Sequence, residues 1–279
     1  MSAAVAKNFA LELPGVRSAD RWVGCPPDCG LVRVVAWNCS QKFATNLVHL
    51  LELDFDVAVV AESAPLEVMV TDGREVTGLY HAPVPPSPKC IGVLARAPWR
   101  VSAYPGLFPQ LPWLLPAVVT GPVDFTVLAV WPVAYPGAPS YPGQLARVLD
   151  EAFPGDGSPV VLAGDLNAPI ASTLTAHLRN VQRLDELGLH SGFLASRGLT
   201  AEEAHGGGVG ASAPVATYYQ HRRRELGFHI DHIFVPKQWP IEEFEVAGYD
   251  AWVGTGRSDH VPLVADITVP IPASAAPTR

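Results

Sequence analysis

Seven polar side chains stand at the ends of apolar runs or in the loops beside them, which makes them candidates for a reactive centre. They are Asn38, Glu62, Asp165, Asn167, Asp231, Asp259 and His260. Carboxylate and amide oxygens are the ligands that Mg²⁺ and Mn²⁺ prefer, and the softer cysteine thiolate is missing from the set. Combined with a histidine that can carry a proton, such a set suits the attack of water on a phosphate ester.

The stretch 160–169 carries the clearest of these positions. Its apolar residues follow Pro159 and stop at Gly164, a pattern typical of a strand buried on both faces. Asp165 and Asn167 then emerge at the strand end, where ligands commonly bind in open α/β sheets. Taken alone, the same stretch could be an ordinary turn after a strand.

Comparable apolar runs position the other candidates. Strands are predicted over 31–37, 55–61 and 228–235, and the loop 254–260 leads into a closing strand over 261–267. Further strands are predicted over 76–80, 90–95, 99–103, 117–120, 124–131, 159–163, 215–220 and 243–249, and helices over 42–53, 141–152 and 172–187. This mixed order predicts an α/β protein with two mixed β-sheets packed face to face and helices outside.

The length of 279 residues fits one large domain, which we expect over 31–268 between an irregular arm, 1–30, and a tail, 269–279. A hydrophobic content of 48% with 16% charged residues supplies an ample core and excludes wholesale disorder. The N-terminus lacks the apolar core of a secretory signal, and no run approaches the roughly 18 apolar residues of a membrane span. We therefore expect a cytoplasmic protein without a membrane span, and no protein partner is evident.

The formal net charge of -8 argues against a protein that holds long nucleic acid by neutralising phosphates. A local groove on an acidic protein can still be basic, and catalytic acids add negative charge that a bound cation cancels. Cys25 and Cys29 could pair or share a metal, although no second ligand pair accompanies them, and Cys39 and Cys90 are predicted to be core thiols.

The proline-rich segment 104–116 is predicted to be neither helix nor central strand, because its prolines remove donors and fix backbone angles. Its aromatic residues either cap the core, the interpretation we favour, or line a substrate wall. Gly206, Gly207, Gly208 and Gly210 predict an irregular stretch that is a connector or, less favoured, a lid.

Five short segments, in order along the chain, resemble the motifs of the endonuclease/exonuclease/phosphatase superfamily, which has the DNase I-like fold. They are VAWN (35–38), VAES (60–63), GDLN (164–167), IDH (230–232) and RSDHVPL (257–263). Each segment is unspecific alone, but five in the same order over about residues 31–268 are hard to attribute to accident. The resemblance implies a four-layer α/β sandwich.

The resemblance also implies a role for each matching residue. Glu62 would ligate Mg²⁺ or Mn²⁺, with Asn38 beside it and Asp259 close enough to help. Asp165 would orient or deprotonate the attacking water, and Asn167 would position that water or donate to the phosphate. His260 would donate to a phosphoryl oxygen as a cation, and Asp231 would accept from its other ring nitrogen and raise its pKa. Arg257, next to this last motif, is a phosphate-binding candidate.

The sequence departs from the family pattern at the end of strand 124–131. Many hydrolytic members carry there a histidine that protonates the leaving oxygen, whereas this chain has Trp131 and Pro132. Tyr135 is a candidate substitute. We interpret the other eight histidines as surface or packing residues, with His229 the one expected nearest the site, and the run Arg222 to Arg224 as a solvated turn.

Three functions are compatible with these residues. The first is a Mg²⁺-dependent phosphoesterase acting on a small phosphorylated metabolite, nucleotide or lipid head group. The second is a DNA nuclease, including an abasic-site repair enzyme, in which Trp113 and Leu114 could act as wedges. The third is a non-catalytic binding module on the same fold. The acidic charge favours the first over the second, and the intact acids argue against the third.

Overall fold

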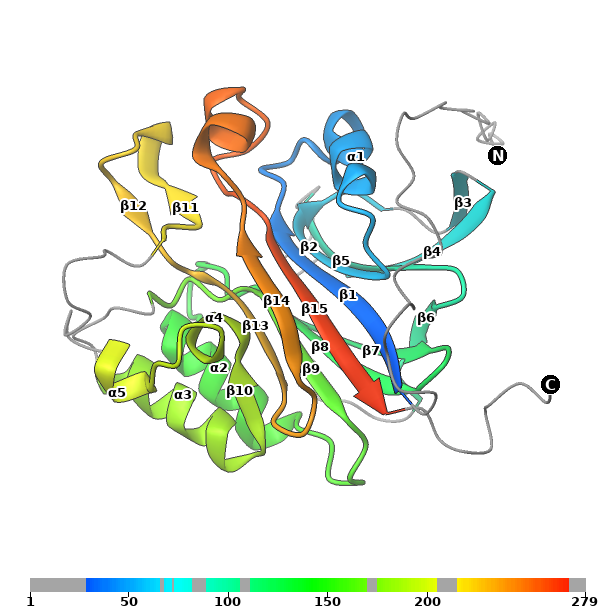
Figure 1. The fold of residues 1–279 in the computed structure, drawn as a ribbon. Helices are drawn as coiled ribbons and strands as arrows, with labels where there is room; N and C mark the ends of the chain where they lie inside the picture. The colour runs from blue at the N-terminus through cyan, green and yellow to red at the C-terminus, as the bar shows by residue number, and fades with distance from the viewer. Residues whose placement is uncertain are drawn as a thin grey trace.

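Two mixed β-sheets pack face to face in the computed structural model, which describes residues 29–65, 68–71, 73–81, 89–105, 111–169, 175–204 and 215–270 (Figure 1). The first sheet has seven strands in the order β14 (Ile241–Val246), β15 (Leu263–Pro270), β1 (Cys29–Asn38), β2 (Val57–Ser63), β5 (Cys90–Arg96), β4 (Arg74–His81) and β3 (Val68–Thr71). The second has six strands in the order β10 (Leu189–Ser191), β13 (Asp231–Pro236), β9 (Val160–Asp165), β8 (Phe125–Val130), β7 (Leu114–Thr120) and β6 (Arg100–Ala103).

Helices cover the outer faces of both sheets. The helices α1 (Phe43–Glu52) and η4 (Asp250–Gly254) pack on the first sheet. The second sheet carries α2 (Tyr141–Glu151), α3 (Thr175–Glu186), α4 (Gly192–Ala195) and α5 (Ala201–Ala204), which lie below it in Figure 1. A small hairpin of β11 (Tyr218–Tyr219) and β12 (Gly227–Phe228), with the turn η3 (Gln220–Arg222) between them, projects beside η4.

The period-two alternation of the strands builds the layers, because successive side chains point to opposite faces of a sheet. In β1, Val34 and Ala36 join the core between the sheets, while Val35 and Trp37 pack outward with α1 and η4. In the same way, alternate residues of β8 and β9 face the central core or the helices α2 and α3. The predicted fold, a four-layer α/β sandwich with helices outside, is confirmed.

The parallel pairs β1–β2 and β8–β9 determine where the polar residues gather. A parallel pair needs a crossover, which α1 and α2 provide, so the carboxyl ends of both strands lie at the same edge. Asn38 therefore lies beside the end of β2 near Glu62, and Asp165 lies beside the end of β8 near Trp131. The pairs β1–β2 and β8–β9 lie in the middle of their sheets, where the strand residues are most deeply buried.

Several element predictions differ from the structure. The expected strand 228–235 is interrupted, because the N–H groups of Ile230 and Asp231 both donate to the Thr217 hydroxyl instead of to a strand partner. Of the expected strand 215–220, only Tyr218 and Tyr219 form a strand, β11. Sequence patterns did not indicate β3, β10, α4, α5 or η4, which are five residues long or shorter.

The prediction that the proline-rich segment 104–116 contains no central strand was wrong, since Leu114 to Pro116 begin the internal strand β7. Pro116 is tolerated because β6 is short and pairs with β7 only from Ala117 onward, so the sheet has a local free edge at the proline. Trp113 and Leu114 are buried, and the Trp113 ring nitrogen donates to the Gln144 carbonyl at 3.0 Å. Leu111, Trp113 and Leu114 thus cap the core, as expected for this segment, and neither Trp113 nor Leu114 is exposed to act as a DNA wedge.

The strand pairing reaches slightly past the expected domain limits, because Cys29 of β1 pairs with Pro270 of β15. Residues 1–28 of the expected arm, 271–279 of the tail, Cys25 and the glycines at 206–210 lie outside the described residues. Cys39 and Cys90 are buried, as predicted. Among the described helices, none has both the length and the apolar character to cross a membrane.

Candidate active site

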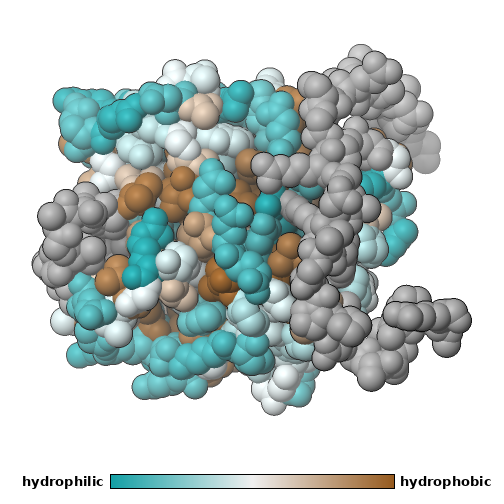
Figure 2. Space-filling view, viewed as in Figure 1, coloured by the Kyte–Doolittle hydropathy of each residue, from teal (hydrophilic) through white to brown (hydrophobic). Residues whose placement is uncertain are grey.

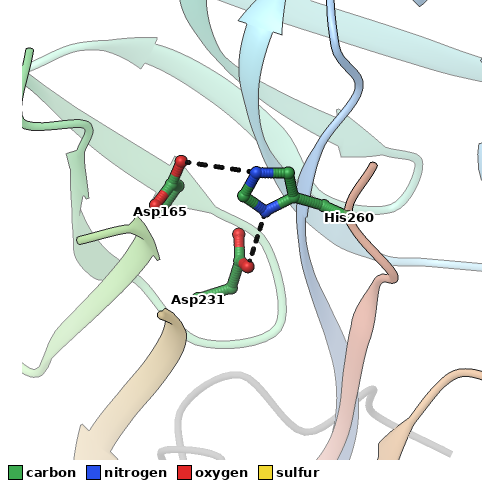
Figure 3. Close-up of side chains that lie close together, drawn as sticks. All are labelled: Asp165, Asp231 and His260. Atoms are coloured by element: carbon green, nitrogen blue, oxygen red, sulfur yellow. Dashed lines mark hydrogen bonds and ion pairs between the residues drawn. The ribbon is translucent and has the colours of Figure 1, made fainter. Parts of the chain in front are cut away.

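Asp165, Asp231 and His260 form the centre of the candidate site (Figure 3). Asp165 ends β9 and Asp231 begins β13, and the two are opposite partners in the antiparallel pairing of these strands. His260 comes from the loop before β15 and joins them by its two ring nitrogens. Nδ1 lies 2.8 Å from Oδ2 of Asp231, and Nε2 lies 3.9 Å from Oδ2 of Asp165. All three side chains are buried.

Hydrogen bonds to the backbone of His260 and a ring contact to its side chain hold the residue in place. The Ser258 hydroxyl donates to the Asn38 carbonyl at 2.6 Å and accepts from the His260 N–H at 3.1 Å. The indole N–H of Trp37 donates to the His260 carbonyl at 3.3 Å. The Tyr218 ring lies over the imidazole with a centroid separation of 4.7 Å. The loop is therefore joined to the end of β1 and to the β11–β12 hairpin, and the imidazole has little freedom to turn.

The two carboxylates and the imidazole shift one another's titration. Burial raises the pKa of Asp165, and the nearby Asp231 carboxylate raises it further, to about 7. Burial by itself lowers the pKa of His260, but the charge and hydrogen bond of Asp231 outweigh it and raise that pKa to about 9. At neutral pH His260 is therefore a cation, while Asp165 holds a proton more readily than an ordinary carboxylate does.

Two asparagines complete the surroundings of Asp165. The Asn38 amide donates to Oδ2 of Asp165 at 3.0 Å, and the Asn167 N–H donates to Oδ1 at 3.0 Å. Asn167 has a φ of 48° and its amide donates to the Pro132 carbonyl at 3.1 Å. Gly164 is required here, because a Cβ would lie 2.2 Å from the Val130 carbonyl oxygen.

The end of β8 thus supplies a backbone acceptor where the family pattern expects an acid. Trp131 is buried in the core between the sheets, and Pro132 offers only its carbonyl. Tyr135 packs against the cluster beneath α2, near enough to Arg147 for the two to interact electrostatically. No described contact joins Tyr135 to Asp165, Asp231 or His260, so the structure does not bring it into the cluster.

Glu62 belongs to the opposite sheet. It lies in an irregular part of β2, where the register with β5 shifts between Val60 and Ser63, and its φ is 54°. The Cys39 thiol donates to the Glu62 carbonyl at 3.2 Å, which places the residue beside the end of β1. Its carboxylate lies 3.1 Å from the Lys89 ammonium and its side chain is 17% exposed. Asp259 is half-buried next to His260, with Oδ1 3.5 Å from the Ser258 hydroxyl.

Two groups of residues offer metal ligands. Asp165, Asp231 and His260 each provide one ligand atom, and these atoms lie within 4.8 Å of one another. Oδ1 of Asp231 is buried without a hydrogen-bond partner among the described residues, as an acceptor waiting for a ligand would be. The ligands that the family resemblance implies, Asn38, Glu62 and Asp259, are a second set of hard oxygen donors, which suit Mg²⁺ or Mn²⁺. The residues present therefore fit a divalent cation.

The remaining candidates lie around this centre. The Arg257 guanidinium stands 5.3 Å from the centroid of the Trp252 ring. His229 and His232 are buried, and burial lowers the pKa of His229 to about 3 and that of His232 to about 4. Both are neutral packing residues, as predicted, and their rings lie 5.4 Å apart.

Four residues that contact the site residues carry no clear signal in the sequence: Thr217, Tyr218, Ser258 and Lys89. Ser258 stands inside a recognised motif and could have been found there. Thr217 and Tyr218 precede Asp231 by more than ten residues, and only the fold of the β11–β12 hairpin brings them to the cluster. No sequence pattern pointed to Lys89, because its ion pair with Glu62 depends on the pairing of the neighbouring strands β2 and β5.

The sequence model of the Endonuclease/Exonuclease/phosphatase family matches residues 35–260, which include every residue of this centre. The chain belongs to that family. No curated protein matches the chain by sequence.

Solved structures with the same fold cover almost the whole chain. The AP endonuclease LMAP from Leishmania major is 14% identical with a TM-score of 0.59, covering 92% of this chain and 93% of its own. The 3′ phosphatase NExo from Neisseria, bound to a product DNA hairpin, is 18% identical with a TM-score of 0.56 and coverages of 84% and 98%. The human Nocturnin catalytic domain with bound sulfate is 16% identical with a TM-score of 0.54 and coverages of 85% and 93%. At these identities the likeness establishes the fold.

Proposed function

We propose that this protein is a Mg²⁺-dependent phosphoesterase that uses water to hydrolyse a phosphate ester of a small metabolite, nucleotide or lipid head group. One observation carries the proposal. A cationic imidazole and a carboxylate of raised pKa face each other across 3.9 Å in a buried site. This separation is too long for a direct hydrogen bond and leaves room for an oxygen atom that contacts both groups.

Asp165 is the group best suited to take a proton from water. A general base works best when its pKa lies near the working pH, and the pKa of Asp165 is about 7. The Asn38 amide and the Asn167 N–H hold one oxygen each, so the carboxylate cannot rotate away from the water that it orients. The Pro132 carbonyl fixes the Asn167 side chain in turn.

His260 is the group best suited to hold a phosphoryl oxygen. Its Nδ1–H donates to Asp231, which leaves Nε2–H directed toward the space beside Asp165 (Figure 3). With a pKa of about 9 it keeps its charge through neutral pH and stabilises negative charge that builds up during the attack. Asp231 orients the ring and sustains its charge.

Glu62, Asp259 and Asn38 would hold the cation. When bound, Mg²⁺ supplies positive charge that polarises the phosphoryl group. Because His260 carries protons on both ring nitrogens at neutral pH, we assign the Asp165–Asp231–His260 cluster to proton and phosphate contacts and leave metal binding to the oxygen donors of the first sheet.

No acid stands at the end of β8 in the described chain, and Tyr135 packs elsewhere. Proton transfer to the leaving oxygen is therefore not built into the site as in family members with a histidine there. We expect turnover to depend on the leaving group, so that aryl phosphates react much faster than alkyl phosphates of similar size.

Turnover of a substrate panel tests the proposal. The panel contains aryl and alkyl phosphates, nucleotides, phospholipid head groups and DNA, each with Mg²⁺ and with chelator. Asp165→Asn, which keeps the shape but not the base, should lower kcat by about 10³-fold on the substrate that is turned over. Asp124→Asn, on an exposed turn, is the control and should keep full activity. Turnover that is unchanged by chelator or by Asp165→Asn contradicts the proposal.

A nuclease is the second candidate. Similar folds include an AP endonuclease and a 3′ phosphatase bound to DNA. Cleavage of DNA alone in the panel would select it, and absence of turnover on every substrate would select the non-catalytic binding module.

A further inference from the structure

Two cations donate to one backbone carbonyl next to the candidate active site, and a third follows that residue in the chain. The Lys42 ammonium donates to the Gly256 carbonyl at 2.6 Å, and the Arg222 guanidinium donates to the same oxygen from Nη1 at 3.4 Å. Arg257 follows Gly256 directly in the chain. Because two of the charged groups share one acceptor, they are close neighbours although they come from different segments of the chain.

None of these three cations has a carboxylate partner among the residues that the structure describes. Their neighbours in the same arginine run behave differently. Arg223 pairs with Glu225 and Arg224 pairs with Asp250. The run was predicted to be a solvated turn, and this holds for Arg223 and Arg224, which are exposed. Arg222 is half-buried and turns toward Gly256 instead.

The backbone is arranged to direct Arg222 this way. His221 and Arg222 have φ values of 54° and 58°, a left-handed conformation that costs a non-glycine residue about 1 kcal/mol or more. The Tyr249 hydroxyl donates to the Arg222 carbonyl at 2.5 Å and holds the strained turn against η4. Gly256 itself has a φ of 78°, and a Cβ there would lie 3.4 Å from Nη1 of Arg222.

The end of η4 does not require three positive charges. One donor satisfies the Gly256 carbonyl, and a single cation near a helix C-terminus gains the available electrostatic benefit. Bringing further half-buried like charges together is unfavourable unless an anion neutralises them. The chain as a whole is acidic, with a formal charge of -8, so this local concentration of cations stands out.

The cluster is joined to the candidate active site through two segments. Lys42 follows Asn38 by four residues. Gly256 precedes His260 by four residues, so these two residues can lie at most about 14 Å apart. The Asn46 amide donates to the Arg257 carbonyl at 2.7 Å and connects the two segments. Figure 2 shows hydrophilic residues at the upper left of the view, where the β11–β12 hairpin lies in Figure 1.

We propose that Lys42 and Arg222, with Arg257 beside them in the chain, bind a second, non-scissile phosphate group of the substrate. Arginine and lysine are the side chains that bind phosphate oxygens most effectively, and the site leaves them without protein carboxylates. The inference rests on the proposed function, because it places this phosphate on the same molecule whose ester is cleaved beside His260. The second phosphate belongs either to a nucleic acid strand or to a small molecule with two phosphate groups.

Binding in chelator tests this site separately from turnover. The probe is a fluorescein-labelled single-stranded deoxythymidine decamer, measured by anisotropy, with adenosine 3′,5′-bisphosphate and adenosine 5′-monophosphate as competitors. Lys42→Gln and Arg222→Gln keep an N–H donor for the Gly256 carbonyl while removing the charge. Arg223→Gln is the matched control, since it removes the same charge from a carboxylate-paired neighbour. Thermal melting confirms that each variant is folded.

The wild type should bind the decamer or the bisphosphate at least tenfold more tightly than the monophosphate. Lys42→Gln and Arg222→Gln should each weaken that binding about tenfold, and Arg223→Gln less than twofold. With the decamer, Lys42→Gln and Arg222→Gln should each reduce the steepness of log affinity against log salt by about 0.7, the value for one lost phosphate contact to a single strand.

The decamer arm identifies a nucleic acid strand, and the bisphosphate arm a small molecule. Equal affinity for all ligands, loss in only one of the two variants, or an equal loss in Arg223→Gln overturns the shared phosphate site. If the site binds as expected while the substrate panel shows no turnover, the proposed function fails and the phosphate site stands.

Discussion

Two groups of residues form unlike halves of the candidate active site. The half that includes Asp165, Asp231 and His260 is sealed, with side-chain exposures of 3%, 0% and 5%, and His260 hydrogen-bonds to Asp231 and lies 3.9 Å from Asp165. The half that includes Glu62 is more open, since Glu62 is 17% exposed and paired to Lys89, which is itself 34% exposed. Charges interact strongly where water is excluded and weakly where it has access. The sealed half can therefore hold fixed protonation states, while the open half remains accessible to an exchanging cation.

Removing one carboxylate from the sealed half should have the largest effect. Asp231→Asn takes away the main cause of the raised pKa of His260, so burial will dominate and the imidazole will become neutral at pH 7. Loss of the cationic donor should lower kcat about 10²-fold. Titration of the His260 ring by NMR measures the cause directly, and kcat measures the consequence.

A matched control separates this effect from general loss of negative charge. Asp250→Asn removes an exposed carboxylate that pairs with Arg224, and it should leave both kcat and the His260 titration unchanged. If His260 still titrates above pH 8 in Asp231→Asn, then Asp231 does not sustain its charge and the contrast between the two halves loses its basis.

Much of the sealed half could be predicted from sequence, because its residues follow from strand ends and short motifs. The apolar run before Asp165 and the motif around Asp259 and His260 sit where the structure places a strand end and the loop before β15. The open half was less predictable. Glu62 was expected after its strand but lies within β2 at an irregularity, and the Lys89 pairing depends on the register of β2 with β5.

The cation cluster shows why the rest could not be predicted. Three adjacent arginines look alike in the sequence, yet the structure distinguishes them by two positive φ angles and by the position of Gly256. Such differences depend on the tertiary contacts of η4 and the hairpin, which short-range patterns do not contain. The missing acid at the end of β8 was visible in the sequence, but its replacement by the Pro132 carbonyl was not.

The sealed half also extends to His232, which supports the loop after Asp165. Its Nε2 lies 2.8 Å from the Ala168 carbonyl, and it borders a cavity of about 20 Å³ that is large enough for about one water molecule. The folded protein holds the pKa of His232 at about 4, against 6.5 for the unfolded chain. Between these pH values the unfolded state binds more protons, so stability must fall as the pH falls from 6.5 toward 4.

His232→Gln should remove this part of the pH dependence. Relative to pH 7, the wild type should lose about 2 kcal/mol at pH 5 through this one residue, and the variant should not. Urea unfolding at pH 7, 6 and 5 measures the difference in slope, which is independent of any constant loss that the substitution causes. Parallel curves for the two proteins would show that His232 does not titrate as its burial implies.

The smallest effect is expected in the open half, at Lys89. A cation that binds Glu62 must compete with an ammonium 3.1 Å from the same carboxylate. At a partly exposed site such a pair is worth about 1 kcal/mol, so Lys89→Gln should increase Mn²⁺ affinity about fivefold, whereas Glu62→Gln should decrease it about tenfold or more. Calorimetric titration with Mn²⁺ measures both. Lys237→Gln is the control, because that lysine pairs with Asp185 on the surface and should not alter metal binding. A decrease in affinity on removing Lys89 would mean that the ammonium orients Glu62 for the metal instead of competing with it, and the open half would then be as fixed as the sealed one.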